Sequence, residues 1–221
     1  MGKHVMITGA TGMVGNLVLK QCIEEDTIEH ITLISRSPHS TSHSKISEVI
    51  HENFSDYSSI SNRFRDVDVA YFCLGAYTGA VPKDMFRKIT VDFTKAFGRT
   101  LKKESPKAVL CFLSGQGADR SEKSRVQFAR DKGEAENFLI GLRFNRLHIF
   151  RPAYIYPSTK RKEPNVFYAI SSWLYPVIFK PLGSKYSITS VQLAKAMYLA
   201  GLNGCDLETL ENKDILDFLK Q

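Results

Sequence analysis

Short apolar runs alternate with amphipathic segments along the first 152 residues of the chain. The runs are rich in β-branched and aromatic residues, which is typical of buried strands, and the segments between them carry apolar residues at helical spacing. The predicted strands are residues 3–8, 30–35, 45–50, 67–74, 107–113 and 146–150. The predicted helices are residues 12–25, 84–103 and 124–143, with a short helix at 57–64.

Strands that alternate with helices and are apolar on both faces predict a parallel sheet between two helix layers. The fold class is therefore α/β, a doubly wound, three-layer parallel sheet with right-handed crossovers. After Pro152 the alternation gives way to prolines and aromatic residues, then a helix at 190–202 capped by Thr189 or Ser190, a late strand at 207–210 and a helix at 212–220. We interpret residues 1–221 as one domain, with a core over 1–152 and a dependent C-terminal cover over 153–221.

Composition narrows the class of protein. The 221 residues are 43% apolar and 24% charged, as in ordinary soluble globular proteins. The four cysteines lie far apart without a C-x-x-C pair, so we expect no disulfide framework or zinc site. Cys73 and Cys111 lie in apolar runs, so we expect them to be buried free thiols. The six histidines form no metal-like cluster, and we expect no metal.

Charge and hydropathy bear on location and partners. The N-terminus lacks a long apolar stretch, and the apolar segment at 169–179 is too short to cross a membrane, so we expect a cytoplasmic protein without a membrane partner. The net charge, 30 − 23 = +7, fits an anionic ligand, nucleic acid, an acidic partner or solubility alone. No basic stripe is interleaved with aromatic residues, which disfavours nucleic acid.

A glycine-rich turn joins the first predicted strand to the first helix. Its sequence, TGATGMVG at residues 8–15, places three glycines at a spacing of three. The first permits a tight turn, the second lets the backbone approach a phosphate, and the third lets the helix pack against the sheet. The pattern predicts a dinucleotide pyrophosphate at the helix N-terminus. The expected cofactor contacts in this turn are Gly9, Thr11, Gly12, Met13, Val14 and Gly15.

The end of the second strand indicates which dinucleotide is bound. An acidic residue there would favour NAD, but the chain has Ser35, Arg36 and Ser37. A guanidinium can bind a phosphate with two parallel hydrogen bonds, so the pattern favours NADP(H); the alternative is a solvated surface arginine. Asn53 and Phe54 are the candidates for the adenine. Further along the cofactor we expect contacts from Leu74, Gly75, Ala76 and Pro152.

Several segments together resemble the short-chain dehydrogenase/reductase superfamily. They are TGATGMVG, ISRS, FCLGA, LSGQGAD, an aromatic-x-x-x-Lys helix and FRPAYIY. The branch looks like the atypical, NmrA-like NAD(P)-binding proteins, and within it the chain is similar to the Tat-interacting protein family of oxidoreductase-like proteins. The narrower likeness lies in the segments at 113–119, 131–139, 146–152 and 210–219, so it spans nearly the whole chain.

This resemblance implies a Rossmann-like sheet of about seven strands. It also implies NADP(H) across the carboxyl ends of the strands, with a substrate cleft under the C-terminal third. Active members use a serine at the end of the fifth strand and a tyrosine followed four residues later by a lysine. The tyrosine is the general acid or base, and the lysine lowers its pKa and binds the nicotinamide ribose.

The chain departs from that pattern at the catalytic position. Lys132 matches the lysine, but the position four residues earlier holds Phe128, which has no proton to give. The catalytic serine corresponds either to Ser114 or to the next position, Gly115. In the second case both proton-handling hydroxyls are gone.

Two functional hypotheses follow. The first is an NADP(H)-binding protein without standard dehydrogenase chemistry, with a role in redox sensing or regulation through a partner. The alternative is an NADPH-dependent reductase of a small carbonyl-type substrate that uses another donor. Tyr154, Tyr156 and Tyr77 are the candidates, or they simply line the cleft.

Two features near the C-terminus stay open. The basic residues 160–162 either attract an acidic substrate or belong to a solvated loop. The aromatic segment at 167–179 either forms a partner or homodimer surface or packs the C-terminal cover on the sheet.

Overall fold

The computed structural model describes residues 2–77, 79–158 and 186–221. The segments at 160–162 and 167–179 lie outside the described residues. The strands are β1 (Lys3–Thr8), β2 (Ile28–Ser35), β3 (Ile46–Ile50), β4 (Val69–Phe72), β5 (Val109–Leu113), β6 (Arg146–Arg151), β7 (Tyr154–Tyr156), β8 (Ser187–Thr189) and β9 (Thr209–Glu211). The helices are α1 (Met13–Glu24), α2 (Lys83–Arg87), α3 (Phe93–Glu104), α4 (Gln127–Gly141), α6 (Ser190–Asn203) and α7 (Asn212–Phe218), with a 3₁₀ helix η1 (Ser58–Phe64) and a π-helical segment η2 (Lys88–Asp92).

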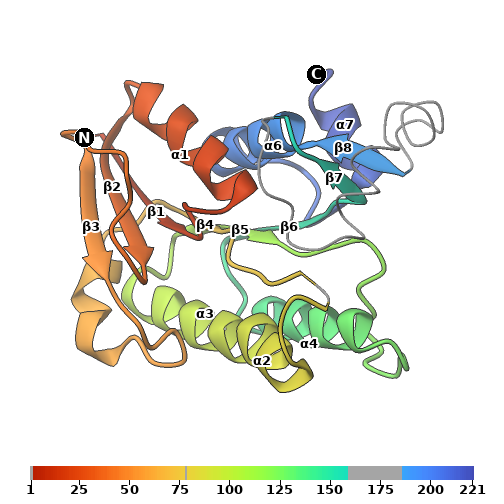
Figure 1. The fold of residues 1–221 in the computed structure, drawn as a ribbon. Coiled ribbons are helices and arrows are strands. Elements are labelled where there is room, and N and C mark those ends of the chain that lie inside the picture. The colour runs from red at the N-terminus through yellow and green to blue at the C-terminus, as the bar shows by residue number, and fades with distance from the viewer. Residues whose placement is uncertain (1, 78, 159–185) are drawn as a thin grey trace.

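Seven parallel strands form the central sheet in the order β3-β2-β1-β4-β5-β6-β9. Helices α1 and α6 cover one face, and α2, α3 and α4 cover the other (Figure 1). The predicted doubly wound parallel sheet in three layers is therefore confirmed. Its strand order reverses between β1 and β4, and ligands of such sheets bind outside the carboxyl ends at this point.

Alternation along the strands divides the core into two halves. In β1, Val5 and Ile7 pack with the α1 and α6 side, whereas Met6 between them packs with the α3 and α4 side. All three side chains are fully buried. Because successive strand residues point to opposite faces, a strand buried on both faces must be apolar at every position, as the sequence indicated.

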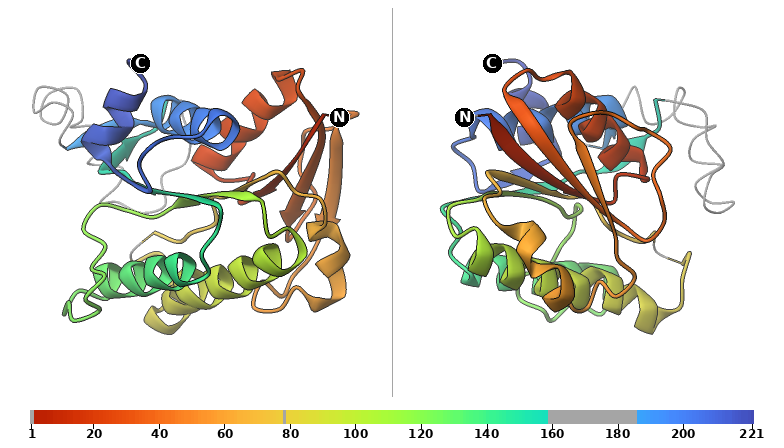
Figure 2. Two further views of the ribbon diagram at one scale, coloured as in Figure 1. Left: turned by 180° about the vertical axis from the view of Figure 1, so that it is seen from behind. Right: turned by 90° about the vertical axis from the view of Figure 1, so that its left-hand side faces the viewer.

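The C-terminal third contributes more than a cover. Strand β9 pairs with β6 as the seventh strand, and α6 packs against α1 in the same helix layer, as both views in Figure 2 show. Thr189 caps α6 with a capping box, since its hydroxyl accepts a hydrogen bond from the Gln192 amide at 3.2 Å. The short parallel pair β7 and β8 was not predicted, because three-residue strands leave little pattern in the sequence.

Cys73 and Cys111 are buried free thiols, as the sequence predicted, whereas Cys205 is only partly buried. All four cysteines belong to the described residues and carry free thiols, and Cys22, Cys73 and Cys111 are buried. Within the described ranges, no His, Cys, Asp and Glu side chains gather in a group able to hold a metal ion. In the same part of the chain, no helix combines the length and apolarity that crossing a membrane requires.

Candidate functional site: a nucleotide cleft at the strand ends

The glycine turn folds as a tight cradle between β1 and α1. Gly9 has a φ of +77°, and a Cβ there would lie 2.7 Å from the Cys73 carbonyl carbon and oxygen. A Cβ on Gly15 would lie 2.3 Å from the Gly9 carbonyl oxygen. The two positions therefore require glycine for different reasons, one conformational and one steric.

The N-terminus of α1 is open for an anion. Gly12 is the N-cap residue and supplies no side-chain hydrogen bond to the first turn. The leading N–H groups of a helix lack intrahelical acceptors and carry the positive end of the helix dipole. Gly12, Met13 and Val14 line the cleft, so these groups face the position where a pyrophosphate is expected.

The loop after β2 contacts both β3 and α1 through polar side chains. Ser35 Oγ is within hydrogen-bond distance of the Ser37 carbonyl at 2.8 Å and of Glu48 Oε1 on β3 at 3.2 Å. Glu48 Oε1 also accepts from the His39 amide at 2.6 Å, and His39 Nε2 lies 3.3 Å from Asn16 Nδ2 on α1. Arg36 in this loop is exposed. Sequence reasoning missed Glu48 and His39, because their roles depend on contacts between distant segments.

The two adenine candidates separate in the structure. Phe54 is only 2% exposed, and its ring packs against the rings of Tyr57 and Phe93 at centroid distances of 5.9 and 5.7 Å. This corrects the expectation that Phe54 offers a face to the adenine, because the hydrophobic core already covers that ring. Asn53 is exposed, and its side-chain oxygen accepts from the Ser55 amide at 3.2 Å.

A cavity of about 270 Å³ lies where β1, β4, β5 and β6 end. The predicted site residues that line it are Gly12, Met13, Val14, Leu74, Gly75, Ala76, Ser114, Phe128, Lys132, Pro152 and Tyr154. Tyr77 and Gly115 line it as well. Its walls thus join residues from turns far apart in the sequence, as expected at the carboxyl edge of a parallel sheet. Gly9, Thr11, Gly15, Ser35, Arg36, Ser37, Asn53 and Phe54 do not line this cavity.

Residues 114 and 115 point in different directions. The Ser114 hydroxyl donates to Glu136 Oε1 at 2.5 Å and is buried. A Cβ on Gly115 would lie 2.7 Å from Cζ at the tip of the Phe128 ring. The sequence left open whether residue 114 or 115 takes the place of the catalytic serine. Residue 115 faces the Phe128 ring, whereas the Ser114 hydroxyl is bonded to Glu136.

Lys132 lies one helical turn after Phe128 on α4 and is 8% exposed. Its Nζ donates to the Leu113 carbonyl at 3.0 Å and lies 5.2 Å from the centre of the Phe112 ring. Burial lowers the pKa of Lys132 to about 8, although the Glu136 carboxylate acts in the opposite direction. An ammonium has three N–H donors, so the Lys132 side chain has further donors for a ligand in the cavity.

We expect Lys132→Met to stabilise the ligand-free protein by about 1–3 kcal/mol near pH 7, because it removes a charge that burial disfavours. Between pH values of about 8 and 10.5, the unfolded chain binds a proton at Lys132 that the folded chain has lost. The wild type therefore gains stability as pH rises through this window, and its difference from the variant shrinks. Urea unfolding of both proteins at about pH 7 and about pH 10 measures the effect. A variant less stable than the wild type at neutral pH contradicts it.

A buried carboxylate lies behind Ser114. Glu136 on α4 is fully buried, and its Oε2 accepts from Arg120 Nε at 2.8 Å and from Arg151 Nη2. Arg151 Nε also donates to Glu136 Oε1 at 2.9 Å, and these bonds raise the pKa of Arg151. Both arginines also contact β9. Arg120 Nη2 donates to Thr209 Oγ1 at 2.6 Å, and Arg151 Nη1 donates to Glu211 Oε1 at 2.9 Å. This network connects the loop after β5 with α4, β6 and β9 beneath the cavity.

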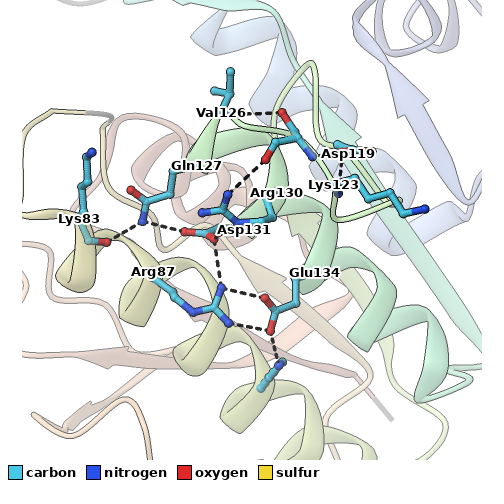
Figure 3. Close-up of polar contacts among 11 residues, drawn as sticks. Lys83, Arg87, Asp119, Lys123, Val126, Gln127, Arg130, Asp131 and Glu134 are labelled. Carbon is cyan, nitrogen blue, oxygen red and sulfur yellow. Dashed lines mark hydrogen bonds and ion pairs between the residues drawn. The ribbon is translucent and has the colours of Figure 1, made fainter.

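A second polar network connects α4 to α2 (Figure 3). Arg87 lies between Asp131 and Glu134, with Nη1 at 3.1 Å from Asp131 Oδ1 and Nη2 at 3.0 Å from Glu134 Oε1. Gln127 Nε2 donates to Asp131 Oδ2 at 3.0 Å and to the Lys83 carbonyl at 2.7 Å. These contacts hold the first turns of α4, which carry Phe128 and Lys132. Sequence reasoning missed both networks, since the charges are scattered along the chain.

Comparison with known proteins agrees with this geometry. Residues 9–148 match the family model described as NAD(P)H-binding. The chain belongs to the NAD(P)H-binding family. It is also similar, over nearly its whole length, to Protein HTATIP2 of Rattus norvegicus, with 28% identity over 222 residues that cover 97% of this chain and 88% of that protein. It is 27% identical over 216 residues to the mitochondrial protein FMP52 of Coccidioides immitis, covering 89% of this chain and 84% of that protein. Membership of the atypical dehydrogenase/reductase branch is thereby confirmed.

Solved structures show the same fold. The Bordetella bronchiseptica enzyme WbmH in complex with NAD⁺ superimposes with a TM-score of 0.69 at 14% identity, covering 95% of this chain and 74% of that one. The PhqB reductase domain from Penicillium fellutanum gives a TM-score of 0.71 at 15% identity, covering 99% and 70%. The predicted Rossmann-like fold is confirmed.

The residues of this family member fit a nicotinamide dinucleotide. The uncapped start of α1 suits a pyrophosphate, and a Cβ on Gly75 would meet nothing within 4 Å, which leaves room for a ligand beside that backbone. Lys132 lines the same cavity and supplies N–H donors that suit ribose hydroxyls. The polar donors and the open backbone thus line one cavity at the strand ends.

Proposed function

We propose that the protein binds NADP(H) and lacks the proton-donating chemistry of standard short-chain dehydrogenases. The observation that supports this most directly is the position of Phe128. This residue lies one turn before Lys132 on α4, and the tip of its ring lies against Gly115. In the standard arrangement both positions carry hydroxyls, and here both are replaced while the lysine and the glycine cradle remain. Retention of the binding residues without the acid favours a binding protein.

Each part of the proposed site has a task. Gly12, Met13 and Val14 present backbone N–H groups to the pyrophosphate, and Arg36 binds the adenosine 2′-phosphate. Lys132 donates hydrogen bonds to the nicotinamide ribose. The bound nicotinamide would supply hydride chemistry, but Phe128 can neither donate nor accept a proton. We infer a role in sensing the redox state of the cofactor and passing it to a partner.

Arg36→Ala should weaken NADPH binding about 10- to 100-fold, because hydrogen bonds between charged groups contribute roughly 1.5–3 kcal/mol. NADH lacks the 2′-phosphate, so its affinity should stay within about twofold. Isothermal titration calorimetry with both nucleotides measures this. Arg63→Ala, which removes an exposed arginine on η1, is the matched charge control.

Wild-type protein that binds neither nucleotide would refute the proposed function. Equal losses of NADPH and NADH in Arg36→Ala would instead refute only the role of Arg36 at the phosphate, and with it the preference for NADP(H). The cytoplasmic location, the homodimer, the substrate and the partner stay predictions, and FMP52 is described as mitochondrial in its own organism.

The alternative is an NADPH-dependent reductase of a small carbonyl compound with another proton donor. It is favoured by Tyr154 and Tyr77, which line the same cavity as Phe128 and Lys132. Tyr154→Phe would then abolish turnover that the wild type already shows.

Phe128→Tyr separates the two hypotheses. Its hydroxyl would extend from the ring tip, which lies close to Gly115, and Lys132 lies one turn away. General acids contribute about 10²–10⁴-fold to rate, so a non-catalytic binder should gain NADPH-dependent turnover of at least about 10²-fold over its background. NADPH oxidation with a panel of aldehydes, ketones, quinones and enones measures it. An active wild type that Phe128→Tyr leaves unchanged would support the alternative.

A further inference from the structure

The side chains of Phe128 and its neighbours Leu74, Leu113 and Ile155 give the cavity an apolar wall. The Phe128 ring tip lies so close to Gly115 that it occupies the space a side chain at 115 would fill. Phe86 backs this ring at a centroid distance of 6.3 Å. Leu74, Leu113 and Ile155 continue the apolar lining. A ligand that reaches this end of the cavity therefore meets aromatic and aliphatic surface.

The polar side chains beside this wall have partners within the protein, and the remaining donors of Lys132 are the ones that the proposed function assigns to the cofactor ribose. The Ser114 hydroxyl donates to Glu136, and Lys132 Nζ donates to the Leu113 carbonyl. Cys73 also lines the cavity, and burial raises the pKa of its thiol to about 12, which keeps it neutral. Tyr77 and Tyr154 also line the cavity, and each residue takes part in another interaction.

We propose that the end of the cavity formed by Gly115 and Phe128 binds a neutral, flat, apolar group and discriminates against a carbonyl oxygen at the same position. The proposal rests on the proposed function, because it assigns the class of second ligand that shares the cavity with the cofactor. A carbonyl that enters loses its hydrogen bonds to water and gains none from the side-chain positions 115 and 128, because glycine has no side chain and the Phe128 ring has no donor. An apolar group of the same shape has no such loss and gains contact with the Phe128 ring.

A matched pair of probes isolates this effect. 2-Acetylnaphthalene and 2-isopropenylnaphthalene have nearly the same shape and differ by a C=O in place of a C=CH₂. Competition against a neutral solvatochromic dye gives the affinity of each probe for the wild type and for the double variant Gly115→Ser/Phe128→Tyr. The variant restores two hydroxyls, and the ring at 128 must turn away from residue 115 to make room for the serine Cβ, which would otherwise lie 2.7 Å from Cζ. The ratio of the two affinities is compared between proteins, so that the different hydration of the probes cancels.

The ratio of the ketone's affinity to the alkene's affinity should be at least about 10-fold higher in the double variant than in the wild type. Chemical-shift changes at the Gly75 and Gly115 amides should show that both probes bind in this cavity. Phe128→Tyr alone should give a smaller shift of the ratio in the same direction, which keeps the test valid if the double variant does not fold.

Two results would overturn the proposal. One is an affinity ratio that is the same in the wild type and both variants. The other is a wild type that prefers the ketone and loses this preference in Tyr154→Phe or Tyr77→Phe, which would show that a tyrosine hydroxyl serves the carbonyl. NADPH titration of the same samples tests the proposed function separately. The probes are measured with and without cofactor, so a failure of NADPH binding and a failure of apolar selection give different results.

Discussion

Glu136→Ala is expected to lower the free energy of unfolding by about 3–5 kcal/mol, the largest loss we predict for a single side chain. The carboxylate is fully buried and accepts hydrogen bonds from Ser114, Arg120 and Arg151. Its removal leaves the Arg151 guanidinium, whose side chain is 14% exposed, without its main partner. A buried charge that loses its partner keeps its desolvation cost and loses the compensating attraction.

Urea unfolding with an unchanged m-value measures the loss. Glu134→Ala is the matched control, since Glu134 lies two residues earlier on α4 and also contacts two cations, Arg87 and Lys95. These partners are 45% and 28% exposed, so the control should lose only up to about 1 kcal/mol. Ser114→Ala removes a single hydrogen bond to Glu136 and should lie between them. Equal losses for Glu136→Ala and Glu134→Ala would contradict the assignment of Glu136 as the central group of a buried network.

Gly133→Ala should destabilise the protein by about 3 kcal/mol or more, whereas Gly141→Ala on the same helix should stabilise it by up to about 1 kcal/mol. A Cβ on Gly133 would lie 1.8 Å from the Asp119 carbonyl oxygen and 2.8 Å from the Arg120 amide nitrogen. These are backbone atoms, so either the loop or α4 must move. A Cβ on Gly141 meets nothing within 4 Å, and only the helix preference of alanine remains.

The two substitutions are chemically identical and differ only in position, so each serves as the control of the other. Thermal or urea unfolding measures whether each variant is more or less stable than the wild type. Gly133 also follows Lys132 directly, and a shift of α4 there should weaken NADPH binding, which calorimetry detects in the fraction that still folds. Two variants with the same sign of stability change would show that close packing of α4 on the loop after β5 is not the deciding factor.

Local patterns were sufficient for most of the fold. Strands β1, β2, β4, β5 and β6 and helices α1, α4 and α6 all appear within a few residues of their predicted ranges. The single helix predicted at 84–103 is instead divided into α2, the π-helical segment η2 and α3. Burial on both faces makes a central strand apolar throughout, and this leaves a clear signal in the sequence. Strands β7 and β8 lack that signal, because each has three residues and pairs with a segment about thirty residues away.

In the candidate site, too, local features were predictable from the sequence and features that depend on packing were not. The glycine turn was predictable because its geometry depends on residues within one loop, and Gly9 and Gly15 have the backbone constraints that require glycine. Phe54 was assigned wrongly, because an aromatic residue after a strand is compatible with both a ligand contact and a core position. Only its packing against Tyr57 and Phe93 distinguishes the two.

The sequence by itself determined the sheet, the glycine cradle and the pairing of Lys132 with a phenylalanine one turn earlier, because strand burial, turn geometry and helical spacing are local properties. Only the tertiary structure decided that Gly115, rather than Ser114, faces Phe128, and that the Ser114 hydroxyl donates to Glu136. It also brought Glu136 together with Arg120 and Arg151. The direction of a side chain after a strand and the partners of a buried charge depend on elements distant in the chain, which no local pattern encodes.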